Sequence, residues 1–227
     1  MTDRSNKEVR VQNDMVAEHF RRSCETLSRA AEDPILRAAI HAIADAITGA
    51  FRAGHKLLIA GNGGSAADAQ HMAGEFLSRL HFDRNPLPAI ALTTDTSVLT
   101  AVGNDYGFDR VFERQVRGLG KSGDVFIAIS TSGRSPNVIA GLKAARDCGL
   151  TTVGFTGTVR GGVMAPLCDH YLAVPSAEIP VIIVTPTRNR AYLGRAYRCS
   201  RCRACETRPK ASRSADARAK PKPMGDR

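Results

Sequence analysis

The sequence predicts an α/β protein with a doubly wound, five-stranded parallel sheet preceded by two N-terminal helices. Five short apolar runs are separated by segments of helical periodicity, and this alternation is typical of a parallel sheet. The runs lack polar alternation, as expected for strands covered on both faces. Two of the runs end in turns rich in glycine or serine that lead into a helix. In sheets of this kind, ligands bind at the carboxyl ends of the strands.

Charge is distributed unevenly along the chain. Residues 1–187 carry 19 basic and 19 acidic side chains, whereas residues 188–227 carry 13 basic side chains and three acidic ones. Residues 1–187, which are expected to fold, therefore have no net charge and offer no broad basic face to nucleic acid. No apolar run is long enough to span a membrane, and residues 1–13 do not resemble a signal peptide, so we expect a cytoplasmic protein.

Composition divides the chain into three parts. Residues 1–14 are polar and charged, and we expect them to form a disordered N-terminus. Residues 15–187 contain the expected helices and strands and form one domain. Residues 188–227 have no sustained apolar periodicity, which predicts a disordered basic tail.

Two helices are expected before the first strand, over residues 15–31 and 34–53. In the second, apolar residues recur at steps of three or four, and Gly54 ends the helix. Such a stripe is usually part of the core, although it could also pack against another subunit. The recurring residues are Leu36, Ile40, Ile43, Ile47 and Phe51.

The first strand is predicted at residues 57–60 and runs into a glycine-rich turn and a helix. Three glycines between residues 61 and 64 let the backbone turn sharply and approach a ligand closely. Ser65 is expected to cap the following helix, whose free N–H groups and positive dipole end suit a phosphate. This segment therefore predicts a phosphate-binding loop.

The same turn also fits the dinucleotide-binding pattern GxGxxA. That pattern predicts an acidic residue about 20 positions further on, at the end of a second strand. Asp83 has this spacing, but residues 81–86 are typical of a loop. Nucleotide binding is therefore the weaker interpretation of the turn.

His71 and Glu75 lie four positions apart on the helix after the turn, and so on one helical face. A phosphate-binding loop followed by a histidine–carboxylate pair favours an enzyme that acts on a phosphorylated small molecule. Taken alone, the pair could equally be two polar residues on a solvated face.

A second strand-and-loop unit follows later in the chain. The strand at 125–129 runs into residues 130–136, where several hydroxyls precede a helix and suit phosphate or sugar contacts. An ordinary serine-rich turn is the alternative. The other elements are expected as strand 89–92, helix 97–102, turn 103–107, helices 112–119 and 137–148, and strands 152–156 and 171–174.

Three motifs together resemble the phosphoheptose isomerase family of sugar isomerase (SIS) domain proteins. They are residues 61–71 (GNGGSAADAQH), 103–108 (GNDYGF) and 129–133 (ISTSG), and the similarity extends over residues 15–180. The resemblance implies an isomerase that converts sedoheptulose 7-phosphate to D-glycero-D-manno-heptose 7-phosphate through an enediol, for lipopolysaccharide and related precursors. It also implies a homotetramer with active sites shared between subunits.

The resemblance further implies a set of site residues. His71 and Glu75 match two zinc ligands, and Glu75 also matches an acid/base that moves the proton between neighbouring carbons. A zinc ion there would polarise the sugar oxygens, but zinc sites usually have three or four protein ligands. The implied phosphosugar contacts are Asn62, Gly63, Gly64, Glu75, Asn104, Asp105, Ser130, Thr131, Ser132 and Ser135.

The sequence departs from the family after residue 180. The family continues with a helix whose glutamine and histidine complete the zinc site, and this histidine is the second acid/base. Here no histidine follows His170, which opens the last expected strand at the edge away from the ligands. Residues 190–198 (RAYLGRAYR) can be encoded so that reading one nucleotide later gives GHIWVGHI. We therefore hypothesise that the tail is a frameshifted form of the family's last helix.

Other interpretations remain for the tail and for the function. Cys199, Cys202 and Cys205 could bind a metal but lack a fourth ligand at a usual spacing. A basic arm that binds RNA or DNA would have only Tyr192 and Tyr197 as aromatic platforms. The alternative function is a non-catalytic SIS-domain protein that binds the replication initiator, which the missing terminal histidine favours.

Overall fold

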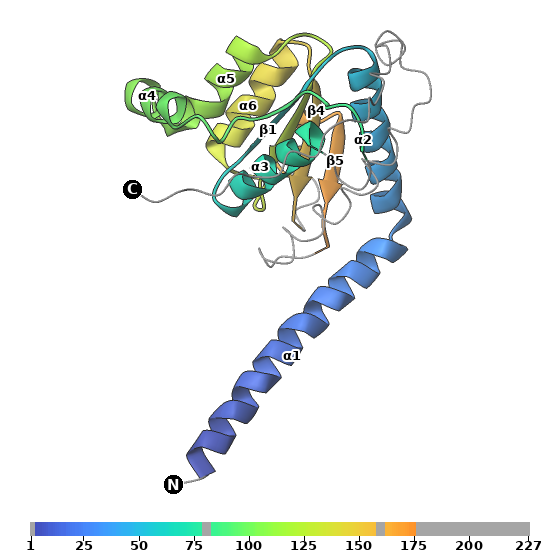
Figure 1. The fold of residues 1–227 in the computed structure, drawn as a ribbon, viewed down its shortest axis with the longest axis vertical. Coiled ribbons are helices and arrows are strands. Elements are labelled where there is room, and N and C mark those ends of the chain that lie inside the picture. The colour runs from blue at the N-terminus through green and yellow to red at the C-terminus, as the bar shows by residue number, and fades with distance from the viewer. Residues whose placement is uncertain (1–2, 79–82, 158–161, 176–227) are drawn as a thin grey trace, which may run out of the picture.

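Five parallel strands form the centre of the computed structural model, which describes residues 3–78, 83–157 and 162–175. The strands follow the order β2-β1-β3-β4-β5, and every neighbouring pair is parallel (Figure 1). This arrangement confirms the predicted fold class. The strands are β1 (Leu57–Gly61), β2 (Ala89–Ala91), β3 (Val125–Ile129), β4 (Thr151–Thr156) and β5 (His170–Ala173).

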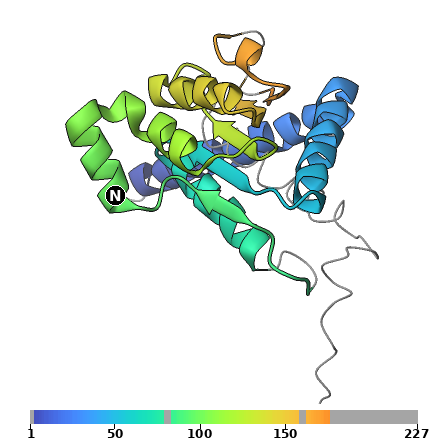
Figure 2. The ribbon, with the colours of Figure 1, turned by 90° about the horizontal axis from the view of Figure 1, so that it is seen from above.

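Helices cover both faces of this sheet. Viewed from above, α2 and α3 lie on one face, and α5 and α6 lie on the other (Figure 2). The helices are α1 (Asp3–Glu32), α2 (Pro34–Arg52), α3 (Gly64–Leu77), α4 (Thr96–Tyr106), α5 (Val111–Leu119) and α6 (Pro136–Asp147), with short 3₁₀ turns η1 (Phe108–Arg110) and η2 (Ala165–Leu167).

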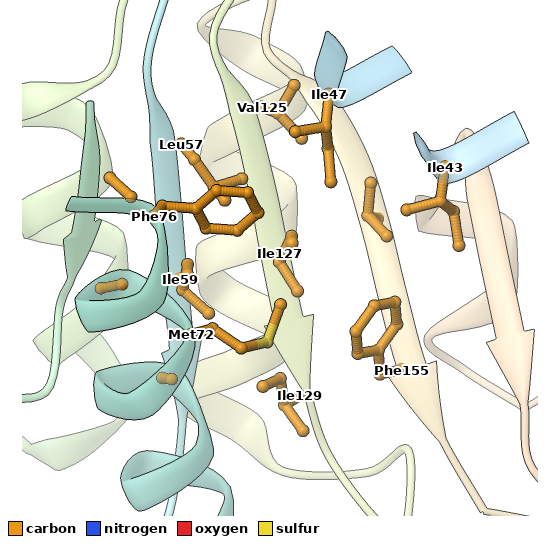
Figure 3. Packing of buried hydrophobic residues seen from close by; sticks show 14 of the residues in the cluster. Ile43, Ile47, Leu57, Ile59, Met72, Phe76, Val125, Ile127, Ile129 and Phe155 are labelled. Carbon is orange, nitrogen blue, oxygen red and sulfur yellow. The ribbon is translucent and has the colours of Figure 1, made fainter. Parts of the chain in front are cut away.

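Successive strand residues enter two different cores. Leu57 and Ile59 point towards α2 and α3, whereas Leu58 and Ala60 join the core under α5 and α6. β1 and β3 are buried at every position, so their residues are all apolar or glycine, which explains the two clearest apolar runs. Figure 3 shows the first core, in which residues of α2 and α3 pack on β1, β3 and β4: Ile43, Ile47, Leu57, Ile59, Met72, Phe76, Val125, Ile127, Ile129 and Phe155.

The N-terminal helices meet at Asp33, whose carboxylate accepts hydrogen bonds from the N–H groups of Ile35 (2.8 Å) and Leu36 (3.1 Å). This N-cap, followed by Pro34, starts α2 in a new direction. The apolar stripe of α2 lies in the core, as expected. α1 begins at Asp3 rather than Met15, so it includes most of the segment expected to be disordered. No helix among the described residues is long and apolar enough to cross a membrane.

The predicted turn at residues 103–107 is wrong. α4 continues through these residues to Tyr106, and the chain turns only at Gly107, whose φ is 87°. Gly103 resembled a stop signal, but a single glycine costs a helix only about 1 kcal/mol and does not have to end it. Asn104 and Asp105 therefore lie in the last turn of a helix.

Two carboxylates close the amino edge of the sheet. Asp124, 2% exposed, accepts hydrogen bonds from the N–H groups of Lys56 (3.0 Å) and Lys121 (2.8 Å) and from the Lys56 ammonium group. Burial by itself raises the pKa of Asp124, but these hydrogen bonds lower the pKa below its usual value. Asp169 accepts from the N–H (2.8 Å) and hydroxyl (2.9 Å) of Thr152 at the start of β4.

Residues 176–227 lie outside the described part of the chain. The expectations for the tail, the departure after residue 180 and the three clustered cysteines therefore remain predictions. His170 opens β5 at the amino edge of the sheet, as expected.

Candidate active site

The strand order creates a switch point between β1 and β3. From β1 the chain first goes to β2 on one side and later returns to β3 on the other, and Gly61 pairs with Ile129 at the carboxyl ends of these neighbours. Residues 62–64 follow β1 and residues 130–135 follow β3, so the two predicted loops lie side by side. Open α/β sheets bind ligands at such a point.

The first loop turns on two glycines with different roles. A Cβ on Gly61 would lie 2.7–2.9 Å from atoms of Ser65, so only glycine fits beneath the helix. Gly63 has a φ of 54° and is the residue from which α3 begins. Ser65 is therefore inside the first turn of α3 and buried, and the prediction that it caps the helix is wrong. Gly63 and Gly64 are exposed, which leaves their backbone accessible to a ligand.

The second loop is held by its own hydroxyls. The hydroxyls of Ser130 and Ser135 lie 2.9 Å apart, and Gly133, at a φ of 63°, donates its N–H to the Ser130 carbonyl (3.0 Å). The Thr131 carbonyl accepts from the Thr156 hydroxyl (3.4 Å). Ser130 is buried, whereas Ser132 is exposed. Ser132 can therefore reach a ligand directly, and the Ser130 hydroxyl braces the loop.

Asn62 and Asn137 connect these two loops. Each side-chain amide donates to the other's oxygen, over 2.8 Å from Asn62 Nδ2 and 2.9 Å from Asn137 Nδ2. Sequence reasoning missed Asn137. The sequence did contain an indication of its role: Asn137 lies one turn before Gly141, on the helix face that also carries core residues. A polar residue on a buried face needs a partner.

His71 and Glu75 lie on the outer face of α3, one turn apart. His71 Nε2 is 3.5 Å from Glu75 Oε1, and the side chains are 55% and 26% exposed, respectively. They face a shallow hollow of about 550 Å³. Its lining residues are Ala67, Gln70, His71, Gly74, Glu75 and Ser78. The Arg84 guanidinium donates to the carbonyls of Glu75 (2.6 Å) and Phe76 (2.7 Å), which holds this end of the helix.

The chemistry of these two side chains can be compared with the predicted zinc site. An imidazole nitrogen and a carboxylate are donors that zinc accepts, and their separation lets both reach one ion. Within the described ranges, no group of three or more His, Cys, Asp or Glu residues could hold a metal. The described residues thus fit two ligands and supply no third.

Asn104 and Asp105 occupy a different part of the fold. The Asn104 amide donates to the Asp105 carboxylate (2.8 Å), and both side chains are exposed. Their helix, α4, packs mainly against η1 and α5 at the periphery of the molecule (Figure 1). The structure thus brings together the two loops, and separately His71 with Glu75, but it places Asn104 and Asp105 on an outlying helix.

Comparison with known proteins agrees with this architecture. A family model described as the SIS domain matches residues 18–157. The fold and the paired loops therefore define a SIS-domain protein. Within that class, the chain belongs to the phosphoheptose isomerase family.

Three relatives illustrate this membership. A phosphoheptose isomerase of Bradyrhizobium sp. (strain ORS 278) is 58% identical over 168 residues, covering 74% of this chain and 84% of the relative. The structure of phosphoheptose isomerase GmhA from Neisseria gonorrhoeae is 40% identical, with a TM-score of 0.75 over 81% of this chain and 97% of its own. A phosphoheptose isomerase from Francisella tularensis is 34% identical, with a TM-score of 0.76 over 82% and 97%.

Proposed function

We infer that this chain is an aldose–ketose isomerase that converts sedoheptulose 7-phosphate to D-glycero-D-manno-heptose 7-phosphate. The observation that carries this conclusion is the 58% identity to a phosphoheptose isomerase over 168 residues. The site agrees with it, because two loops suited to a phosphosugar lie beside a helix that presents a carboxylate. We further propose that the product supplies lipopolysaccharide and related precursors and is made in the cytoplasm.

The phosphosugar would bind across the switch point. The exposed backbone of Gly63 and Gly64 and the exposed hydroxyl of Ser132 offer hydrogen bonds from the two loops. The N-termini of α3 and α6 both begin at this edge of the sheet, and their dipoles favour an anion there. Thr131 and Ser135 would shape the second loop around the ligand.

Glu75 is the residue that would move the proton. Its carboxylate would remove the proton from the carbon beside the ketose carbonyl and return it to the neighbouring carbon, while a proton passes between the two oxygens of the enediol. The side chain is partly exposed and faces the hollow on α3, so a sugar can reach it. His71 and Glu75 would together bind zinc, and a bound zinc would stabilise the negative charge of the enediolate.

We propose that the active unit is a homotetramer with shared sites. α1 projects from the body of the molecule, and Met15 and Phe20 on it are 70% and 65% exposed (Figure 1). A second copy would cover this apolar surface. Asn104 and Asp105 would then contact a sugar bound to another subunit, which accounts for their position on an outlying helix.

Binding and isomerisation can be tested separately. Calorimetry should show that the chain binds sedoheptulose 7-phosphate, and NMR of the sugar should show conversion to the aldose. Light scattering should give the mass of four chains. Absence of both binding and turnover at millimolar sugar would refute the proposed function.

Shared sites can be tested by mixing two inactive variants. Glu75→Gln and Asp105→Asn chains, unfolded and refolded together, should regain part of the activity, because some mixed sites contain neither substitution. If the mixture stays as inactive as each variant alone, the sites are not shared.

A further inference from the structure

The Asn62–Asn137 pair links segments that are 75 positions apart in the sequence. Asn62 begins the loop after β1, and Asn137 lies in the first turn of α6 and is 2% exposed. Asn62 is only half-buried. The pair thus has a buried member and a member that borders the ligand position.

A backbone group determines which way both amides point. The N–H of Val138 donates to Asn137 Oδ1 (2.9 Å), so this atom must be the oxygen and the Asn137 nitrogen must face Asn62. The Asn62 oxygen then faces that nitrogen, and the Asn62 nitrogen donates back to Asn137 Oδ1. A backbone N–H of α6 therefore sets the orientation of a side chain in the other loop.

The pair leaves hydrogen-bonding capacity on one member. An amide oxygen accepts two hydrogen bonds and an amide nitrogen donates two. Asn137 Oδ1 accepts from both Asn62 and Val138 and is saturated. Asn62 uses one N–H and one lone pair in the pair, so it retains one of each for a ligand.

We propose that Asn137 is a positioning residue that fixes the Asn62 amide, so that its second N–H points to the phosphosugar before the sugar arrives. This inference rests on the proposed function, since the sugar is the ligand. Because the amide is already oriented, binding does not have to order it, and affinity rises accordingly. Asn137 acts through Asn62 and does not touch the sugar.

A double-mutant cycle tests this mechanism. Calorimetry with sedoheptulose 7-phosphate should show affinity about tenfold weaker for Asn62→Ala, the loss expected for one hydrogen bond near 1.4 kcal/mol. Asn137→Ala should weaken affinity by a similar factor, and the double variant should be no weaker than Asn62→Ala. Leu142→Ala is the matched control: it truncates another fully buried side chain of α6 and should lower thermal stability while leaving affinity unchanged.

Side-chain NMR of the ligand-free protein gives an independent readout. One Asn62 amide proton should be shifted away from the position of a free asparagine side chain and should exchange slowly with water; Asn137→Ala should remove both features. Asn137→Asp, which keeps the side-chain volume, should alter the same signals if the alanine variant does not fold. Unchanged Asn62 signals, or losses of affinity that simply add, would overturn the inference. Failure of the unaltered chain to bind the sugar would refute the proposed function, while the NMR result would still decide whether Asn137 orients Asn62.

Discussion

The two edges of the same sheet differ in how their polar groups are used. At the amino edge, Asp124 accepts two backbone N–H groups and the Lys56 ammonium, and Asp169 accepts both polar hydrogens offered by Thr152. At the carboxyl edge, the backbone of Gly63 and Gly64 is exposed. At the amino edge these carboxylates are hydrogen-bonded within the protein, whereas at the carboxyl edge backbone groups remain accessible to a ligand. Stability and binding should therefore respond to different substitutions.

The largest effect should come from Glu75. In a chain whose tail is returned to the other reading frame by deleting one nucleotide near codon 180, Glu75→Gln should abolish isomerisation but leave sugar binding largely intact. General acid–base groups contribute about 10²–10⁴ in rate each. Turnover measured by NMR and affinity measured by calorimetry would separate the two properties.

The unrepaired chain is the matched comparison for this experiment. If the frameshift hypothesis is right, it lacks the second acid/base and should isomerise the sugar about 10²–10⁴ times more slowly than the repaired chain. Repair should also increase zinc retention, measured by metal analysis after dialysis. Full activity in the unrepaired chain would contradict the hypothesis.

Asp124→Asn should lower the stability of the fold and leave the affinity for the sugar unchanged. The substitution removes the charge that pairs with Lys56 and places an NH₂ group against N–H donors, so we expect a loss of about 2–3 kcal/mol in the free energy of unfolding. The control is Asp147→Asn, which breaks an exposed pair with Arg117 and should cost less than about 1 kcal/mol. Denaturant titration measures both, and a large change in sugar affinity for Asp124→Asn would contradict the separation of the edges.

The contribution of Asp124 should also depend on pH. Its pKa in the folded chain is lowered, so its charged form stabilises the fold above the unfolded pKa of about 4. This stabilisation is lost as the pH falls through the folded-state pKa. The stability difference between the unaltered chain and Asp124→Asn should therefore be full at pH 7 and shrink below about pH 4.

Ser132→Ala should show the opposite pattern, with lower affinity and unchanged stability. Ser132 is exposed, and its hydroxyl accepts only a long hydrogen bond (3.3 Å) from the Arg134 N–H. Loss of a sugar contact should weaken binding about three- to tenfold. Ser122→Ala, an exposed serine at the amino edge, is the control and should leave affinity unchanged. Equal affinity for Ser132→Ala and the unaltered chain would remove Ser132 from the site.

The smallest effect is expected from Arg134→Gln. In the described segments that directly follow the five strands, Arg134 is the one side chain with a permanent positive charge. It is exposed, so its attraction for a phosphate is screened by salt. Calorimetry should show affinity about two- to threefold weaker at low salt and nearly equal affinity at high salt. An effect that persists at high salt would indicate direct contact with the sugar instead.

Burial explains which parts of the fold could be predicted from the sequence. The central strands β1 and β3 are covered on both faces, so their apolar runs are easily found, and the Leu36–Phe51 stripe identified the packed face of α2. The ends of helices were harder to predict, because they depend on local dihedral angles. Gly103 stays helical, whereas α3 is capped at Gly63, two residues earlier than the expected Ser65 cap.

The sequence predicts which site residues lie together only where those residues are close in the chain. The spacing of His71 and Glu75 on one helix is enough to place them together. The partnership of Asn62 with Asn137 depends on β1 and β3 being neighbours, which the order of elements along the chain does not reveal. For the same reason, the motif containing Asn104 and Asp105 could be recognised but not located, because its position depends on how α4 packs on α5.

Gly61 and Gly63 of the first loop are required for different reasons, and only the second reason depends on the chirality of the residue. Gly61 lacks room for an L-side chain, since its Cβ would meet Ser65, whereas Gly63 has open space around its Cβ position but a backbone that L-residues avoid. The mirror image of the Gly63 dihedrals lies in the extended region that L-residues favour, so a D-residue would adopt the native turn without strain. In a chemically synthesised chain, position 63 would therefore accept D-alanine and reject L-alanine.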